Sequence, residues 1–230
     1  MSKLTLSPET LAKLEKLNSI NQSLKIVQGS KTIRSVSESK TTAVETTIAE
    51  EFPRMFCIYD LREFLAVYNI IEKPVIDFAD PRFIVIHSED GSQRMRYIDA
   101  GEDIVKSSYV PGLPDLPSLD LEVALSKDQI DRVMKAARML GSEFVGFTCD
   151  GTDIYVKAFD KSNGDGNESN AFSIKLGQSS QVFKLFYKSQ AWQVLDNDCV
   201  FTISKKRISK IVSGDLTYLM TLDANSSFEG

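Results

Sequence analysis

A predicted helix at residues 127–140 carries basic side chains that could contact DNA phosphates. At about 100° per residue, its apolar positions share one face: Ile130, Val133, Met134 and Ala137. Its basic positions lie on the opposite face or flank the apolar stripe: Lys127, Arg132, Lys135 and Arg138. Such cations attract a DNA duplex, which carries one negative charge per ~1.7 Å of its axis. An ordinary solvated helix face explains the same pattern, so both interpretations stay open at this point.

Two other basic clusters give weaker signals. In the predicted helix at residues 7–19, Lys16 points away from the leucine stripe and Lys13 flanks it, while two glutamates offset both charges. The other cluster, Lys205-Lys206-Arg207 with Lys210, sits at a predicted strand-to-strand turn. That position is typical of a plain charged hairpin.

Residues that usually carry catalysis are sparse in this chain. The single histidine, His87, follows an apolar run and is predicted to end a strand. The three cysteines lie far apart beside apolar runs, which predicts buried thiols: Cys57, Cys149 and Cys199. Residues 162–168 lack the ligand spacing of a calcium loop and predict a hairpin loop. We therefore predict no catalytic residue, no metal site and no cofactor, and we do not expect an enzyme.

Length and composition limit the classes of protein that remain. The chain has 230 residues, 42% of them hydrophobic, and a net charge of −5. A chain of this size can bury ~70% of its extended surface, enough for one or two domains. No apolar run approaches the ~18 residues of a membrane helix, and no signal peptide is recognisable. The expectation is a soluble, intracellular, globular protein.

The chain is predicted to alternate short strands with a few helices. Besides the helix at residues 7–19, helices are predicted from Asp60, after a capping box at Ser126–Gln129, and at residues 189–195. The predicted strands of the first half are 24–28, 32–39, 41–49, 55–59, 75–79, 83–87 and 93–98. Those of the second half are 119–125, 143–149, 153–159, 171–176, 182–187, 199–204, 207–212 and 217–222.

Both halves follow one order, strand, helix, four strands, helix and three strands, with the terminal strands left open. This is an internal repeat of roughly 110 residues. Residues 107–118 lie between the halves, hold three of the seven prolines and predict an extended connector. We therefore predict an α+β fold of two similar domains with largely antiparallel sheets, at residues 1–106 and 119–230.

Several segments resemble the sliding clamps, or DNA polymerase processivity factors, of T4-type bacteriophages. They are the strand entering the second helix (Cys57-Ile58-Tyr59-Asp60-Leu61 with Phe64-Leu65) and the last strand, Tyr218 to Ala224. The duplicated order and the proline-bearing connector match over essentially the whole chain. The resemblance implies a homotrimeric ring around duplex DNA that performs no chemistry. It also implies an ATP-driven clamp loader, a phage DNA polymerase that is tethered, late transcription factors as possible partners, no membrane, and action in the cytoplasm of the infected bacterial host.

The resemblance also implies roles for particular residues. Helices lining the hole would make sequence-independent phosphate contacts through Lys13, Lys16, Lys127, Arg132, Lys135 and Arg138. The second helix is left out because Asp60 and Glu63 nearly cancel Arg62. A C-terminal peptide of the polymerase would enter an apolar pocket lined by Leu113, Leu116, Leu219 and Met220. Edge strands joining two subunits would include Ile104, Val110, Phe172 and Ile174.

Two rival hypotheses come from other classes. An enzyme with an unrecognised site is disfavoured by the scarcity of histidine. A module for single-stranded nucleic acid would need aromatic side chains on an exposed basic face. The 13 phenylalanines and seven tyrosines mostly fall in apolar strand and helix patterns, which favours cores instead.

Overall fold

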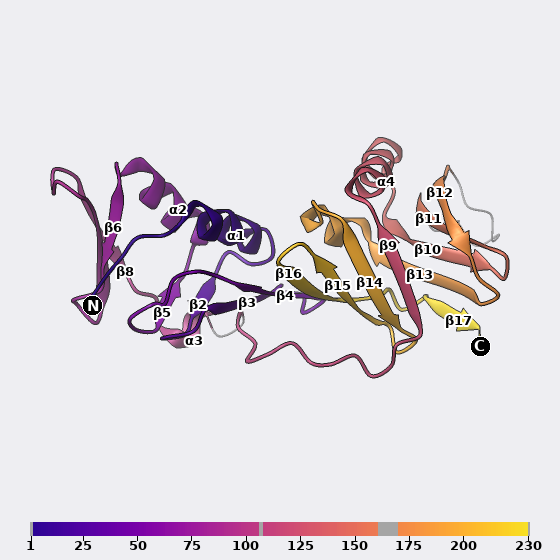
Figure 1. Cartoon of the computed structure of the whole chain (residues 1–230), viewed down its shortest axis with the longest axis horizontal. Coiled ribbons are helices and arrows are strands. Elements are labelled where there is room, and N and C mark those ends of the chain that lie inside the picture. The colour runs from indigo at the N-terminus through magenta and orange to yellow at the C-terminus, as the bar shows by residue number, and fades with distance from the viewer. Residues whose placement is uncertain (1, 106–107, 161–169, 230) are drawn as a thin grey trace. The chain divides into compact units, whose positions relative to one another are not determined.

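The computed structural model describes residues 2–105, 108–160 and 170–229, and the chain divides into two compact units, Met1–Leu113 and Pro114–Gly230 (Figure 1). The division falls within the segment 107–118 that was predicted as a connector. Residues 109–120 contain no helix or strand. The predicted hairpin loop at 162–168 lies outside the described residues. None of the described helices combines the length and apolar character needed to cross a membrane.

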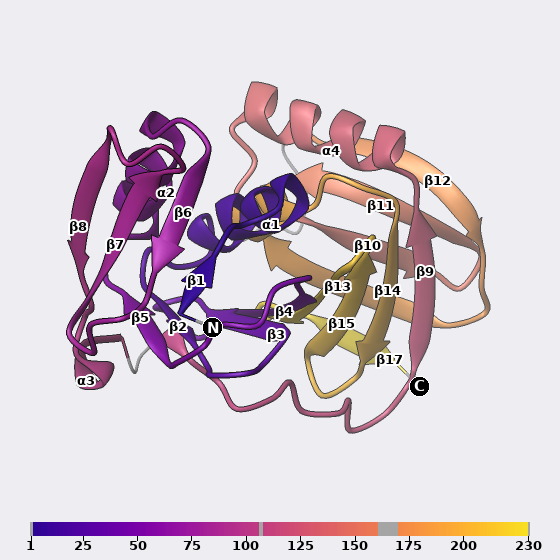
Figure 2. The ribbon, with the colours of Figure 1, turned by 60° about the vertical axis from the view of Figure 1, so that its left-hand side comes forward.

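The first unit contains three helices in its described part, α1 (Pro8–Asn18), α2 (Leu61–Ile70) and α3 (Glu102–Val105). Its strands are β1 (Lys3–Leu4), β2 (Leu24–Ile26), β3 (Thr32–Val36), β4 (Thr42–Thr47), β5 (Phe56–Ile58), β6 (Pro74–Asp77), β7 (Phe83–Ser88) and β8 (Arg94–Ile98). An antiparallel sheet has the order β1-β6-β7-β8, with β8 at one edge. Further antiparallel pairs join β2 to β5 and β3 to β4. α1 and α2 lie side by side in Figure 2 and contact each other.

The second unit repeats the order of strands and helices of the first, and most of its strands are longer. Its strands are β9 (Leu121–Leu125), β10 (Phe144–Asp150), β11 (Asp153–Phe159), β12 (Phe172–Gln178), β13 (Val182–Lys188), β14 (Cys199–Ser204), β15 (Ile208–Ser213), β16 (Leu216–Thr221) and β17 (Ser227–Glu229). One antiparallel sheet has the order β12-β11-β10-β13-β17, and β9, β14, β15 and β16 pair in that sequence in another. The helix α4 (Lys127–Leu140) packs against β10, β11 and β12. The 3-10 helix η2 (Ser189–Val194) contacts α4, β10 and β13.

Both units therefore follow the predicted order of strand, helix, four strands, helix and three strands. The α+β fold with antiparallel sheets, predicted from the sequence, is confirmed. Three details differ from the prediction. The short helix α3 was not predicted from the sequence. The second helix of the second unit is a 3-10 helix, and β17 was not predicted as a strand because its three residues gain a partner only by pairing with β13.

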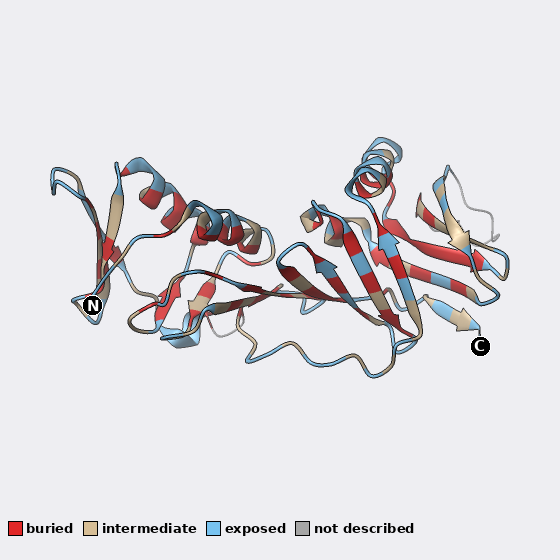
Figure 3. Ribbon diagram, in the orientation of Figure 1, coloured by how far each residue is buried: buried red, intermediate tan, exposed pale blue. Residues whose placement is uncertain are grey.

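Aromatic side chains form the centre of each core. The buried residues are red on the ribbon of Figure 3. In the first unit Phe56 lies 5.8 Å from Phe64 and 5.7 Å from Phe78, both in edge-to-face geometry. In the second unit the Trp192 ring lies 4.9 Å from Phe201 and 5.6 Å from Phe147, both in tilted geometry. Such pairs add to the large apolar area that each ring buries. All three cysteines are buried, as predicted.

Candidate nucleic-acid interface

The helix α4 begins and ends at residues whose local chemistry fixes its length. The Ser126 side chain accepts from the backbone N–H of Gln129, and the Gln129 side chain accepts from the backbone N–H of Ser126. This reciprocal capping box satisfies two of the free donors at a helix start. The helix ends at Gly141, whose φ of 67° is a left-handed conformation that suits glycine. The four predicted apolar positions are buried, which leaves the basic positions at the surface.

The four cations of α4 differ in how far they are neutralised. Lys127 donates to Asp131 at 2.5 Å, and this hydrogen bond raises the pKa of the lysine. Arg132 lies 3.8 Å from Asp128, a long pair between two exposed side chains that solvent screens strongly. Lys135 and Arg138 are exposed and form no ion pair within the described part of the chain. The second half of α4 therefore carries the cations that are most available to an anion.

The prediction that Lys13 faces DNA is corrected by its surroundings. Lys13 is only 8% exposed, and its ammonium donates to the Glu9 carboxylate at 2.6 Å and to the Thr47 carbonyl at 2.8 Å. Because β4 ends at Thr47, the side chain is held between the helix and that strand end. Lys16 is half-buried in the last turn of α1, and its role at DNA stays a prediction.

The second helix of the first unit offers little positive charge. The Asp60 carboxylate caps α2 by accepting from the backbone N–H groups of Arg62 and Glu63. The hydrogen bond from the Glu63 N–H is the main reason that the pKa of Asp60 is lowered, so this group stays ionised. Its charge lies 3.4 Å from the Arg62 guanidinium. These charges are consistent with leaving α2 out of the predicted DNA contacts.

The residues predicted for a peptide pocket are only partly brought together. Leu219 and Met220 are consecutive residues of β16, 5% and 1% exposed, so their side chains leave opposite faces of the sheet. Met220 shares its face with the buried Tyr218, whereas Leu219 is paired in register with the exposed Lys210. One surface cannot include both, and Met220 is a core residue. Leu113 and Leu116 are half-buried, and their part in a pocket stays a prediction.

Two of the four residues predicted for a subunit interface fall on a strand edge. Phe172 and Ile174 lie on β12, which is an edge strand of its sheet, and both are half-buried. Ile104 is exposed but belongs to the short helix α3, so the prediction of an edge strand there is corrected. Val110 lies in no strand. β8 is an edge strand in that unit, and its Ile98, which the sequence analysis did not select, is 70% exposed.

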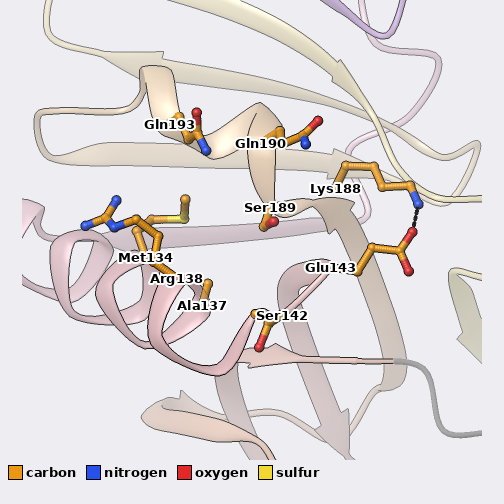
Figure 4. Close-up of a pocket in the computed structure, with 10 residues that line it drawn as sticks. Met134, Ala137, Arg138, Ser142, Glu143, Lys188, Ser189, Gln190 and Gln193 are labelled. Atoms are coloured by element: carbon orange, nitrogen blue, oxygen red, sulfur yellow. Dashed lines mark hydrogen bonds and ion pairs between the residues drawn. The ribbon is translucent and has the colours of Figure 1, made fainter.

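Two surface grooves adjoin α4. The groove between α4 and the start of β12 has a volume of about 540 Å³, and Arg132, Lys135, Met139 and Phe172 are among its lining residues. The other groove, between α4 and η2, also measures about 540 Å³ and is drawn in Figure 4. Within the described residues, no group of histidine, cysteine, aspartate or glutamate side chains could hold a metal ion. The exposed cations Arg132 and Lys135 make the groove beside β12 suited to binding an anion.

Comparison with known proteins gives one curated relative and many similar structures. No family model matches the chain. The sliding clamp of Vibrio phage KVP40 is 26% identical over 223 residues, which cover 95% of this chain and 99% of the relative. The resemblance to phage sliding clamps, predicted from the sequence, is confirmed.

The similar structures establish the fold. Proliferating cellular nuclear antigen of A. fulgidus, bound to the C-terminal region of FEN-1, has a TM-score of 0.63 at 14% identity, covering 99% of this chain and 100% of that chain. The corresponding antigen of Entamoeba histolytica has a TM-score of 0.63 at 12% identity, covering 96% and 98%. The Helicobacter pylori beta clamp bound to a DNA ligase peptide has a TM-score of 0.63 at 14% identity, covering 96% and 65%. The chain has the fold of these clamps.

Proposed function

We propose that this chain, a relative of phage sliding clamps with the clamp fold, acts as a DNA sliding clamp. In this proposal three copies close into a ring around duplex DNA and tether a DNA polymerase, so that synthesis becomes processive. The ring holds DNA topologically and performs no chemical step. The observation that carries the proposal is the exposed basic face of α4 in a chain whose net charge is −5.

The charge distribution supports encirclement more than tight binding at a surface. α4 carries four basic and two acidic side chains, while the whole chain is acidic. A few cations directed at the duplex attract its phosphates, whereas negative charge elsewhere disfavours adventitious contact with other DNA. Contacts to phosphates carry no sequence information, which suits a protein that must move along any sequence.

Ring closure is proposed to join edge strands of neighbouring copies. β12 and β8 are edge strands with half-buried or exposed apolar side chains, including Phe172 and Ile98. An exposed strand edge presents unpaired N–H and C=O groups that another strand can pair with. Pairing of β12 with β8 of the next copy would bury both edges. Three copies would complete the ring.

Partner binding is proposed by analogy with the similar structures. The A. fulgidus and Helicobacter pylori proteins were solved with the C-terminal region of FEN-1 and with a DNA ligase peptide, respectively. For this chain the proposed ligand is a C-terminal peptide of the phage polymerase, with Leu219 and the connector residues Leu113 and Leu116 as contacts. An ATP-driven loader and late transcription factors complete the proposed partners. The proposed place of action is the cytoplasm of the infected host.

The experiment that tests the assembly is light-scattering mass across a dilution series at near-physiological salt. A closed trimer has three times the chain mass of 25.7 kDa, about 77 kDa. Phe172→Asp should lower this mass by placing a charge on the β12 edge, whereas Val212→Asp, on an exposed position of β15, should not. A monomer at high concentration, with circular dichroism showing a folded chain, would overturn the homotrimeric ring.

A further inference from the structure

The groove between α4 and η2 has an apolar floor and a polar rim. Met134 and Ala137, which are 4% and 3% exposed, contribute the floor from α4. The rim carries polar side chains from α4, η2 and the segments beside them: Arg138, Ser142, Glu143, Lys188, Ser189, Gln190 and Gln193. Such a rim provides hydrogen-bond donors around an opening of about 540 Å³.

The orientation of η2 is fixed by one buried side chain. Trp192 is fully buried and packs 5.5 Å from Tyr187 as well as against Phe147 and Phe201. Gln190 and Gln193 are three residues apart, and side chains at this spacing eclipse each other on a 3-10 helix. Because Trp192 faces the core, both glutamines are exposed on the groove side. Both glutamines therefore leave the same face of η2, toward the groove.

The charges of the groove separate into two ends, as Figure 4 shows. At one end the Lys188 ammonium is paired with the Glu143 carboxylate and lies 4.4 Å from the centre of the Phe144 ring. Arg138 and Gln193 lie at the other end, away from that ion pair. Arg138 has no ion pair within the described residues. One uncompensated positive charge thus remains, beside neutral donors.

A further polar atom lines the groove without a partner. The Ser142 side chain is 5% exposed, and its Oγ forms no hydrogen bond within the described part of the chain. A buried hydroxyl without a partner costs free energy, so a ligand or water that satisfies it is favoured. Figure 4 shows this hydroxyl directed away from Gln190 and Gln193, so the contacts to a ligand come from the exposed side chains of the rim.

We propose that this groove holds one phosphodiester of the duplex. Arg138 provides the positive charge, and the side-chain amides of Gln190 and Gln193 donate hydrogen bonds to the phosphate oxygens. The Glu143 carboxylate repels an anion, so the phosphate lies at the Arg138 end. This inference rests on the proposed function, and it adds neutral donors from η2 to the cations of α4. This Arg138 end of the groove, which we call the seat, carries a single full charge. The contact therefore exchanges readily, as sliding requires.

The test measures the affinity of the full chain for a fluorescein-labelled linear 30-base-pair duplex by anisotropy, across a series of salt concentrations. Linear ends let a ring thread without a loader. Each phosphate contact made by a cation contributes about 0.9 to the slope of log K against log salt. Arg138→Gln should therefore weaken binding and reduce the slope by about 1.

The glutamine variants distinguish hydrogen bonding at the seat from the general electrostatic attraction between the chain and DNA. Gln190→Ala with Gln193→Ala should weaken binding about tenfold, the loss expected for two neutral hydrogen bonds, with an unchanged salt slope. The nearly isosteric Gln190→Glu with Gln193→Glu should weaken it further, because the added carboxylates repel the phosphate. The matched controls, Gln181→Ala and Lys184→Gln, change exposed residues away from the groove and should leave affinity at the wild-type value.

Each remaining outcome has a definite meaning. If both glutamine variants bind like the wild type while Arg132→Glu with Lys135→Glu binds more weakly, the seat is overturned and the proposed function stands. If the wild-type chain does not bind the duplex at the lowest salt, the seat is overturned, while the proposed function, which holds DNA topologically, is decided by the light-scattering mass. Circular dichroism and light scattering on every variant exclude loss of fold or assembly as the cause.

Discussion

The ammonium of Lys13 lies 2.8 Å from the carbonyl oxygen of Thr47, a residue 34 positions later in the chain. The same ammonium pairs with Glu9 one helical turn earlier. A lysine that flanks the apolar stripe of its own helix thus ties the helix to the end of a strand. Its contribution belongs to the stability of the first unit, not to DNA binding.

Replacing Lys13 by methionine should destabilise the chain without altering its affinity for DNA. The change removes a charge-assisted hydrogen bond and leaves the Thr47 carbonyl without this donor, at a cost of about 2 kcal/mol. Urea unfolding followed by circular dichroism measures the loss. Lys206→Met, at an exposed turn, is the control and should unfold like the wild type. Normal stability of Lys13→Met together with weaker DNA binding would restore the original prediction for this residue.

Charge reversal at Arg132 and Lys135 should shorten the DNA products of a polymerase that uses this clamp. Both side chains are exposed on α4, and reversing them turns attraction to phosphates into repulsion. The change should leave the mass of the assembly intact. Product length in primer extension at low salt is the measurement, with Lys184→Glu on β13 as the control. Unchanged product length would remove this face of α4 from the DNA interface.

Acid should destabilise the wild type more than a Glu50→Gln variant. Glu50 accepts from the Ser7 N–H at 2.6 Å and from Thr10 Oγ1 at 2.5 Å. Burial alone would raise the pKa of this carboxyl, but these hydrogen bonds outweigh it and the net pKa is lowered. The unfolded chain therefore binds more protons than the folded chain below the ordinary pKa of 4.5, and stability is lost as the pH falls through the folded-state pKa.

Melting temperatures between pH 7 and pH 3 measure this effect. The wild type should lose more stability than Glu50→Gln over the acid part of that range. Glu51→Gln is the control, since Glu51 is exposed and pairs only loosely with Lys31, at 3.4 Å. Identical acid profiles of the wild type and Glu50→Gln would contradict the assigned role of Glu50 at the start of α1.

Gly146→Ala should destabilise the second unit strongly. A Cβ atom at Gly146 would lie 1.9 Å from the carbonyl oxygen of Leu185, and a backbone atom cannot move aside cheaply. Overpacking of this kind costs about 1–3 kcal/mol or more. Gly177→Ala is a matched control in the same sheet, because a Cβ there meets nothing within 4 Å. Thermal unfolding compares the two variants, and equal melting temperatures would show that the strands relax around the added methyl group.

Local signals predicted local structure well. The capping box at Ser126–Gln129 and the apolar spacing that follows it place α4 at the predicted residues, since every interaction involved lies within a few positions. The N-cap at Ser7 did the same for α1. The succession of strands and helices along the chain followed from the repeat, because each half carries its own turn and strand signals.

Contacts between distant segments set the limits of that prediction. The burial of Lys13 depends on Thr47, which no pattern in the helix reveals. The assignment of Leu219 and Met220 to one pocket failed for a different reason, since strand alternation alone already separates them. The groove beside η2 depends on Trp192 packing into the core, and only the fold shows that this turns both glutamines outward.

The groove that Arg132 and Lys135 share with Phe172 has a thermodynamic consequence. On the proposed assembly, one side of this groove contacts phosphates and the other contacts the next copy. Closure of a subunit against Phe172 would change the local field at both cations, so DNA occupancy and subunit association become linked equilibria. By reciprocity, any factor by which DNA strengthens closure is the factor by which closure strengthens the hold on DNA. Opening the ring around DNA would then cost the free energy of the subunit contacts and that of the coupled DNA contacts together.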